Sequence, residues 1–269
     1  IRKCTNRLTK TAIEKISLEK IWVSKSSKTH DLSEFVKQLR PVSNGRGLKR
    51  FGPPGDGGYL LPDDLEGVVA CISPGVATES GFDHEVADRG IEVYMADASV
   101  DGPAIHHEKF HFLNKHLDVF NSSKTITIDD FCKKILPRNN ANADLILQMD
   151  IEGAEYSIIL NMREETLNRF RIMVIEFHDL HQIFSKFSFS LIKSVFSRLT
   201  KNHKIVHIHP NNVIAPYKKN GLAVPPIMEF TFYRTDRDTF GGEPLIFPHP
   251  LDADNVKDRP PVILPKCWQ

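Results

Sequence analysis

The sequence predicts an α/β fold built around an open, mostly parallel β-sheet. Short apolar runs rich in β-branched residues alternate with stretches of helical periodicity, which is the pattern of consecutive βαβ units. Several of these runs end in acidic residues, as strands do where a sheet of this kind carries a site. The last apolar run, residues 226–233, alternates between apolar and polar positions and is expected to pair antiparallel to the others.

Composition and charge narrow the class of protein. The 269 residues carry a formal net charge of +1, so no global field favours nucleic acid, and we expect no nucleic-acid partner. No run is long enough to span a membrane. The four cysteines are dispersed without a CxxC pair, which predicts neither a zinc site nor a disulfide framework. Together with the lack of a recognisable signal peptide, this predicts a cytoplasmic location.

We expect three segments along the chain. Residues 1–50 are polar and weakly patterned and are predicted to form an arm with one or two helices. Residues 51–235 hold the βαβ pattern and form the central domain. Residues 236–269 are rich in Pro and are expected to be a wrap or tail of that domain. The sequence leaves the oligomeric state open.

A stretch rich in Gly and Pro, residues 50–62, precedes the first core strand. Its composition predicts no regular element. It is either a plain surface turn or a loop in which the backbone approaches a ligand closely, with Tyr59 as an aromatic wall. Its position immediately before the sheet favours the second interpretation.

The first βαβ unit has the layout of a nucleotide-binding unit. A strand at residues 68–73 leads into a turn that contains Gly75, a helix follows at 79–89, and a second strand ends at Asp97. In such units a ligand lies against the glycine turn, and the acid after the second strand accepts hydrogen bonds from ribose hydroxyls. The alternative for Asp97 is an ordinary acid in a turn.

The remaining elements follow in the same alternation. We predict strands at residues 109–112, 144–149, 171–177, 204–210 and 226–233, with helices after residues 127 and 154 and at 180–200. In the last helix, the predicted buried stripe is Ile183, Phe187, Leu191, Val195 and Leu199.

Acidic residues gather where two of these strands end. Asp150 and Glu152 follow the strand at 144–149, and Glu176 and His178 end the strand at 171–177. The carboxyl ends of parallel strands form the edge at which α/β proteins bind ligands, so we expect these side chains to form a site. The alternative is that Asp150 and Glu152 only cap the following helix.

Several motifs together resemble one enzyme family. They are Pro74-Gly-Val-Ala77 with Phe82-Asp83, the strand that ends Tyr-Met-Ala-Asp97, the run Asp150-Ile-Glu-Gly-Ala-Glu155, and Val174-Ile-Glu-Phe-His178. This set is similar to FkbM-type methyltransferases, which are class I S-adenosylmethionine-dependent enzymes. The resemblance implies a Rossmann-like fold with a seven-stranded, mostly parallel sheet, an antiparallel last strand and helices on both faces.

The resemblance also implies which residues bind S-adenosylmethionine. Ser73 and Gly75 would lie against the methionine part, Asp97 would hold the ribose hydroxyls, and Ala98 with Ser99 would border the adenine. Asp150 would also contact the cofactor. From the chemistry of the Gly- and Pro-rich stretch, we expect Gly58 and Tyr59 to close over the amino-acid end of the cofactor.

FkbM-type enzymes mostly methylate hydroxyl groups, often on sugars, so the expected acceptor is a glycan or another small molecule. A hydroxyl needs a base or a metal ion to react near neutral pH. We expect Glu152 to be the base, Asp150 to orient the acceptor or bind a metal, and His178 to belong to the catalytic group. Asp150, Glu176 and His209 can form a site for Mg²⁺ or Mn²⁺. The alternative is that Glu176 and His178 only bind neighbouring backbone.

Two other functions stay open at this point. A nicotinamide-dependent oxidoreductase can use the same α/β plan, although the single glycine turn and the acidic end of the strand at 144–149 argue against it. A non-catalytic carbohydrate-binding protein is the second alternative.

Overall fold

The computed structural model describes residues 24–135, 143–237, 240–241 and 244–269, so the first 23 residues of the predicted arm lie outside the described residues. At its centre is a seven-stranded sheet in the order β10-β13-β9-β8-β3-β4-β5. Only β13 runs antiparallel to its neighbours, which are β9 and β10. The predicted fold class is confirmed. The strands are β3 (Val68–Pro74), β4 (Glu92–Ala96), β5 (Phe110–Leu113), β8 (Asp144–Met149), β9 (Phe170–Phe177), β10 (His203–Pro210) and β13 (Met228–Arg234).

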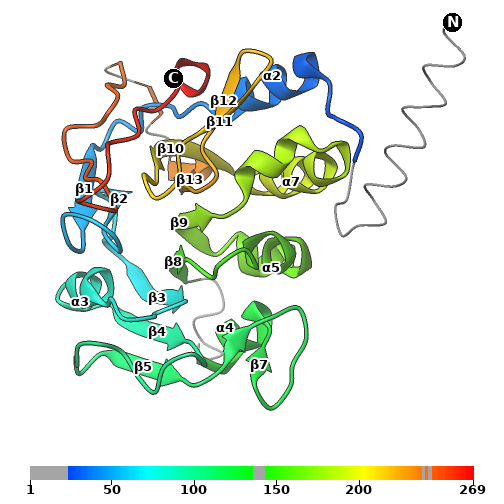
Figure 1. The fold of residues 1–269 in the computed structure, drawn as a ribbon. Coiled ribbons are helices and arrows are strands. Elements are labelled where there is room, and N and C mark those ends of the chain that lie inside the picture. Colours follow the sequence, from blue (N-terminus) through cyan, green and yellow to red (C-terminus); the bar gives the residue numbers. More distant parts are fainter. Residues whose placement is uncertain (1–23, 136–142, 238–239, 242–243) are drawn as a thin grey trace, which may run out of the picture.

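Helices cover both faces of this sheet (Figure 1). Helix α3 lies on one face, and α4, α5 and α7 lie on the other. The helices are α2 (Thr29–Gln38), α3 (Gly81–Ala87), α4 (Ile128–Ile135), α5 (Glu155–Asn161), α6 (Glu164–Leu167) and α7 (Lys186–Leu199), with 3₁₀ helices at Leu180–Phe184, Thr235–Arg237 and Lys266–Trp268. None of the helices in the described ranges is long and apolar enough to cross a membrane.

The central strands are apolar on both faces because each face packs on its own core. In β8, Leu145 and Leu147 belong to the cluster that includes α5 and α7, whereas Ile146 belongs to the cluster that includes α3. Successive side chains of a strand point to opposite faces, so a strand between two helical layers needs an unbroken apolar run. This fixes β8 in the middle of the molecule, with its C-terminal end free to carry polar groups.

The Gly- and Pro-rich stretch is more ordered than the sequence indicates. Its two ends pair as an antiparallel hairpin of β1 (Leu48–Phe51) and β2 (Tyr59–Pro62). Glycine makes the connection possible: a Cβ atom at Gly58 would lie 2.0 Å from the carbonyl oxygen of Pro53. The remaining short strands are β6 (His116–Leu117), β7 (Thr125–Ile126), β11 (Tyr217–Lys219) and β12 (Leu222–Val224).

The predicted buried stripe after β9 is wrong in part. Phe187 and Leu191 are exposed, at 73% and 44%, and the buried face of α7 is formed by Phe189, Ile192, Val195, Phe196 and Leu199. The chain forms a 3₁₀ helix as far as Phe184 and begins α7 only at Lys186. Because the 3₁₀ segment has three residues per turn and the α-helix 3.6, a stripe extrapolated through both loses its phase.

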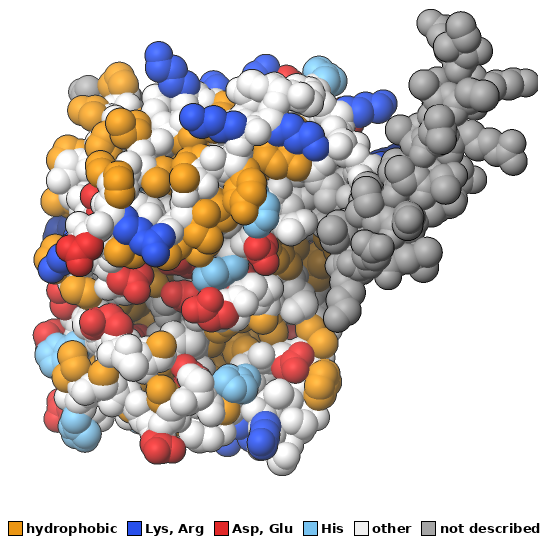
Figure 2. Space-filling model, in the orientation of Figure 1, with side chains coloured by type: hydrophobic (Ala, Val, Ile, Leu, Met, Phe, Trp, Pro, Cys, Tyr) orange, Lys and Arg blue, Asp and Glu red, His pale blue; other side chains and the backbone are white. Residues whose placement is uncertain are grey.

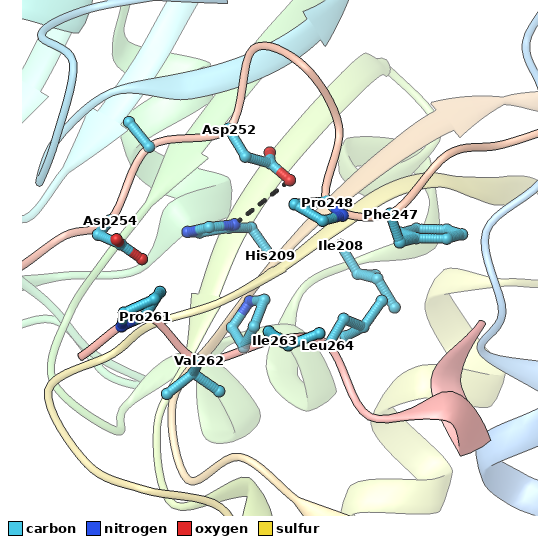
Figure 3. A pocket seen from close by; sticks show the side chains of 12 residues that line it. Ile208, His209, Phe247, Pro248, Asp252, Asp254, Pro261, Val262, Ile263 and Leu264 are labelled. Atoms are coloured by element: carbon cyan, nitrogen blue, oxygen red, sulfur yellow. Dashed lines mark ion pairs between the residues drawn. The ribbon is translucent and has the colours of Figure 1, made fainter.

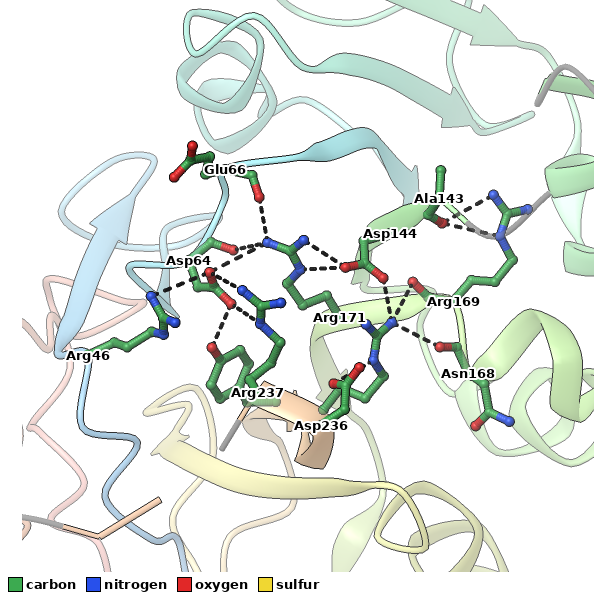
Figure 4. Close-up of polar contacts among 12 residues, drawn as sticks. Arg46, Asp64, Glu66, Ala143, Asp144, Asn168, Arg169, Arg171, Asp236 and Arg237 are labelled. Carbon is green, nitrogen blue, oxygen red and sulfur yellow. Dashed lines mark hydrogen bonds and ion pairs between the residues drawn. The ribbon is translucent and has the colours of Figure 1, made fainter. Parts of the chain in front are cut away.

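An arginine and aspartate network closes the edge at which the parallel strands begin (Figure 4). Arg171 at the start of β9 donates from Nε to Oδ2 of Asp144 at 2.8 Å and from Nη1 to the backbone oxygen of Asp64 at 3.0 Å. Arg234 contacts Asp144 at 2.6 Å, and Arg237 donates to Asp64 at 2.7 Å. Burial opposes ionisation of both carboxyls, but the arginines, joined at Asp64 by the Tyr233 hydroxyl, outweigh it, and the pKa of Asp64 and that of Asp144 lie below their usual values.

Removal of Arg171 should destabilise the fold strongly. We expect Arg171→Met to lower the free energy of unfolding by about 3 kcal/mol, because it leaves two largely buried carboxylates with fewer cations. Urea denaturation followed by far-UV circular dichroism measures the change. The matched control is Lys49→Met, which breaks the exposed Lys49–Asp63 pair at 2.7 Å and should cost less than about 1 kcal/mol. Equal losses in the two variants would show that the network does not stabilise the sheet.

Candidate active site

Two turns meet at the opposite edge, where the parallel strands end. Gly75 follows β3 with a φ of +83°, and Asp150 follows β8. A Cβ atom at Gly75 would lie 1.7 Å from the carbonyl oxygen of Asp150, a distance that no side chain tolerates. The backbones of the two turns are therefore in direct contact, and the predicted cofactor turn lies against the predicted catalytic turn.

Asp97 connects the turn after β3 with the segment after β4 through hydrogen bonds to both. Its Oδ2 accepts a hydrogen bond from the backbone N–H of Ala77 at 3.0 Å, and its Oδ1 accepts two from Ser99 at 2.7 Å. Burial opposes ionisation of Asp97, but these hydrogen bonds outweigh it, and its pKa lies below the usual value. The side chain is thus an ionised acceptor. It is held in place by both the glycine turn and the segment that follows β4.

A cavity of about 390 Å³ lies between these turns. Its wall holds the predicted Gly75, Asp97, Ser99, Asp150 and Glu152, together with residues that the sequence did not single out, Ala77, Ala96, His116, Leu117, Ile151 and Ala154. The cavity wall therefore contains both predicted cofactor residues, such as Asp97, and the predicted catalytic residues Asp150 and Glu152.

The turn after β8 is held by a residue that sequence reasoning missed. Glu155 is fully buried, and its Oε1 accepts hydrogen bonds from the backbone N–H groups of Ile151 and Gly153, both at 3.1 Å. Glu152 lies between them in the left-handed region, with a φ of +56°. A non-glycine residue rarely adopts this conformation, and such residues concentrate at functional sites. The third acid of the Asp-Ile-Glu-Gly-Ala-Glu run was the available signal for this role.

The imidazole ring of His178 lies close to three carboxylates. Its Nε2 lies 3.5 Å from Oε2 of Glu152 and 3.8 Å from Oδ1 of Asp150, and its Nδ1 lies 3.2 Å from Oε1 of Glu155. Burial opposes protonation of His178, but Glu155 and then Asp150 and Glu152 outweigh it, so its pKa is raised. Asp150, Glu152 and His178 each offer one atom within 4.8 Å of the others, a spacing that can hold a metal ion.

Asp150 and Glu152 differ in environment. Burial raises the pKa of Asp150 to about 7, although His178 lowers it, and its Oδ1 accepts no hydrogen bond from the described part of the chain. The Glu152 side chain is 88% exposed. Asp150 is therefore the carboxyl that titrates near neutral pH, and Glu152 is the one in contact with solvent.

The predicted metal residues Glu176 and His209 lie in a buried row beside Asp150. Glu229 of β13 pairs in register with Glu176 on one side and with His209 on the other. Burial, and then Asp150 and Glu229, raise the pKa of Glu176 well above its usual value. Asp150, Glu176 and His209 are not a set whose ligand atoms all approach within 4.8 Å among the described residues; the structure brings Asp150 together with Glu152 and His178 instead.

His209 faces the C-terminal segment rather than the cavity. Figure 3 shows it pointing toward Asp252, and both residues line a separate cavity of about 210 Å³ between β10 and that segment. The distance from Nδ1 of His209 to Oδ2 of Asp252 is 3.6 Å. Asp252 also contacts Nε2 of His207 at 2.9 Å. The two histidines therefore hold the C-terminal segment against the sheet.

The remaining predicted cofactor residues do not line the cavity of about 390 Å³. Tyr59 is buried, and its hydroxyl accepts a hydrogen bond from Nε2 of Gln148 at 3.4 Å. Ser73 is also buried and donates to Oε1 of Gln148 at 2.8 Å. The backbone N–H of Ala98 contacts Nδ1 of His116 at 3.4 Å. Gly58 packs within its own hairpin, and its neighbour Gly57 lines a small chamber with Tyr59 instead.

Figure 2 shows that acidic side chains gather across the middle of the face on which the parallel strands end, with histidine side chains beside them. Lysine and arginine side chains lie mostly in the upper part of this view. A cavity on a face with many acidic side chains favours ligand groups that donate hydrogen bonds or carry positive charge.

The comparison with known families decides the assignment. Residues 92–204 match the family model described as "Methyltransferase FkbM domain". This chain carries an FkbM methyltransferase domain. The match extends from β4 into β10 and includes Asp97 and the turn after β8, whereas Gly75 lies before it. The predicted resemblance is confirmed, and with it the class of S-adenosylmethionine-dependent methyltransferases. No curated protein matches the chain.

Solved structures resemble this chain only distantly. Fibrillarin from Methanococcus jannaschii, a pre-rRNA processing protein, has 13% identity and a TM-score of 0.39, with 70% of this chain and 71% of that chain covered. The N-methyltransferase NodS from Bradyrhizobium japonicum has 11% identity and a TM-score of 0.32, covering 62% and 87%. MycE, a methyltransferase of the mycinamycin pathway in complex with Mg and SAH, has 16% identity and a TM-score of 0.32, covering 67% and 45%. These similarities carry no inference about acceptor or metal.

The contact between the two turns predicts the effect of a single methyl group. We expect Gly75→Ala to abolish binding of S-adenosylhomocysteine, because the new Cβ forces the turns after β3 and β8 apart. Isothermal titration calorimetry measures the binding.

The matched control is Gly90→Ala. Gly90 has a φ of +85° but no atom within 4 Å of an added Cβ, so the variant should lose about 1–2 kcal/mol of stability and keep its affinity. A Gly75→Ala protein that binds the ligand normally would contradict the described contact.

Proposed function

We propose that this protein transfers the methyl group of S-adenosylmethionine to a hydroxyl group of a glycan or another small molecule. The observation that carries the proposal is the cavity that runs from Asp97 past Gly75 to Asp150. One end carries an ionised acceptor for a ribose diol, and the other carries a titratable carboxyl. A methyl donor with a nucleoside at one end and a sulfonium at the other suits this arrangement.

The residues present suit the cofactor. The Gly75 turn has no side chain to obstruct a ligand, Asp97 accepts from hydroxyls, and Ser99 and Leu117 lie on the wall beyond Asp97. When bound, S-adenosylmethionine supplies an electrophilic methyl group. The residues of this chain supply its orientation and the removal of a proton from the acceptor.

Asp150 is the residue we propose as the proton acceptor. A base works best when its pKa lies near the working pH, and Asp150 meets this condition, with an Oδ1 that has no hydrogen-bond partner among the described residues. The sequence favoured Glu152 for this role. Its exposure and its contact with His178 favour instead a role in orienting the His178 ring beside Asp150.

With His178 neutral, the same three side chains would hold a divalent cation, and the cation rather than Asp150 would then activate the hydroxyl. Two carboxylates and an imidazole suit Mg²⁺ or Mn²⁺, and such an ion lowers the pKa of a bound hydroxyl. We propose Asp150, Glu152 and His178 as its ligands in place of the predicted set with Glu176 and His209.

We propose that the substrate that receives the methyl group binds on the side of the buried row formed by Glu176, Glu229 and His209. Asn255 of the C-terminal segment donates to Glu229 at 2.9 Å and to Asp56 at 3.2 Å, and Asn211 donates to Glu176 at 3.0 Å. Oε2 of Glu176 and Oδ1 of Asn255 are buried and have no hydrogen-bond partner in the described chain. These unpaired polar atoms suit a ligand rich in hydroxyl groups, which both donate and accept hydrogen bonds.

Activity should depend on ionised Asp150. We expect Asp150→Asn to lower turnover by about 10²–10⁴-fold while the dissociation constant of S-adenosylhomocysteine stays within about threefold. In the wild type, turnover should fall as the pH drops below about 7, because protonated Asp150 cannot accept a proton. Transfer of tritiated methyl groups to glycan extracts measures both.

Glu152→Gln serves as the comparison and should keep more activity than Asp150→Asn. If Glu152→Gln abolishes turnover and Asp150→Asn does not, the role of base returns to Glu152.

The cation site has a readout that does not need the acceptor. We expect Mn²⁺, followed by electron paramagnetic resonance, to bind the wild type and to lose affinity in His178→Ala. His111→Ala, which removes an imidazole paired with Glu92 at 2.8 Å, is the control and should bind Mn²⁺ normally. Weak binding that is equal in all three proteins would exclude the site.

A further inference from the structure

A small chamber continues from the cavity on the side of the hairpin. Its volume is about 100 Å³, and it shares Gly75, Ala77 and Asp150 with the wall of the larger cavity. Tyr59, Phe82 and Gln148 form part of its remaining wall. The chamber therefore opens beside the point at which the turns after β3 and β8 meet, and it has room for only a few non-hydrogen atoms.

The chamber is lined with acidic side chains. Four acidic residues face it, Asp56, Glu79, Asp83 and Asp150, and no Lys, Arg or His is among the described residues of its wall. An anionic group would be repelled there, whereas an ammonium group would be attracted. A cofactor that carries both a carboxylate and an ammonium on one carbon must therefore turn its ammonium toward this chamber.

Most of these carboxylates already have partners. Oε1 of Glu79 accepts from the backbone N–H groups of Ser80 and Gly81, at 2.9 and 2.7 Å. Asp56 accepts from Asn255. Asp150 faces His178. Oδ1 of Asp150, like that of Asp83, has no hydrogen-bond partner in the described part of the chain, but only Asp150 faces a histidine. Asp83 is 4% exposed and forms no ion pair within the described residues.

A buried carboxyl without a cation is costly unless a ligand compensates it. Burial raises the pKa of Asp83 to about 7, although the neighbouring Ser73 hydroxyl lowers it. An asparagine would fill the same space without this cost. The acid at this position is therefore best explained by a positively charged group that enters the chamber when the site is occupied.

We propose that Asp83 accepts a hydrogen bond from the α-ammonium group of the methionine part of S-adenosylmethionine. This inference rests on the proposed function, because it assumes that S-adenosylmethionine is the cofactor. It assigns Asp83, on the first turn of α3, as a residue that selects the amino-acid end of the cofactor. Asp83 takes no part in the chemistry of methyl transfer.

The test compares ligands that differ only at the amino-acid end. Calorimetry is carried out on the full chain with S-adenosylhomocysteine, with its deaminated analogue, and with 5′-methylthioadenosine, which lacks the whole amino-acid end. We expect Asp83→Asn to weaken S-adenosylhomocysteine by about 30-fold or more, and to leave the other two ligands within about threefold.

The control is Asp88→Asn, the same substitution at the exposed C-terminal end of α3, which should alter none of the three affinities. Equal binding of S-adenosylhomocysteine to wild type and Asp83→Asn would overturn the proposal. So would equal losses for all three ligands, because these would indicate a structural role.

The wild type alone provides a second measurement if Asp83→Asn does not fold. The deaminated analogue should bind it about 30-fold or more weakly than S-adenosylhomocysteine, and equal affinities would overturn the proposal. Failure of the proposed function is distinguishable, since in that case neither S-adenosylhomocysteine nor 5′-methylthioadenosine binds the wild type.

Discussion

The site depends on one close contact, that of the Gly75 turn with the backbone of Asp150. Two parallel strands that are neighbours in the sheet, β3 and β8, end at this point, and only glycine leaves room for the turns to meet. The contact fixes the distance between the part of the cavity that holds Asp97 and the part that holds Asp150. Glu155 and Asp97 then fasten the two turns from their far sides, each with backbone N–H groups as donors.

Charge is distributed unequally between the two edges of the sheet. At the edge where the strands begin, Arg171 and Arg234 neutralise Asp144, so that the buried ions serve stability. At the edge where the strands end, acidic groups outnumber cations, and Glu176, Glu229 and Asp83 have raised pKa values because of burial. Uncompensated burial of this kind costs stability and is characteristic of functional sites.

The sequence was sufficient to predict the sheet and to locate the acidic residues that follow its strands. Apolar runs without alternation locate β3, β8 and β9 because both faces of these strands are buried, and the acids that follow them share an edge by topology. The sequence did not predict contacts between segments that are distant along the chain. The unpartnered Asp83 and the β1–β2 hairpin depend on packing that no local pattern encodes, and the phase of α7 depends on a 3₁₀ segment before it.

The central claim is that a nucleoside-bearing methyl donor lies along the edge between Asp97 and Asp150. A crystal structure of the protein soaked with S-adenosylhomocysteine tests it most directly. The account predicts density for the ribose hydroxyls at Asp97 and for the sulfur beside Gly75 and Asp150. Ligand density elsewhere on the molecule, with this cavity holding only solvent, would contradict it.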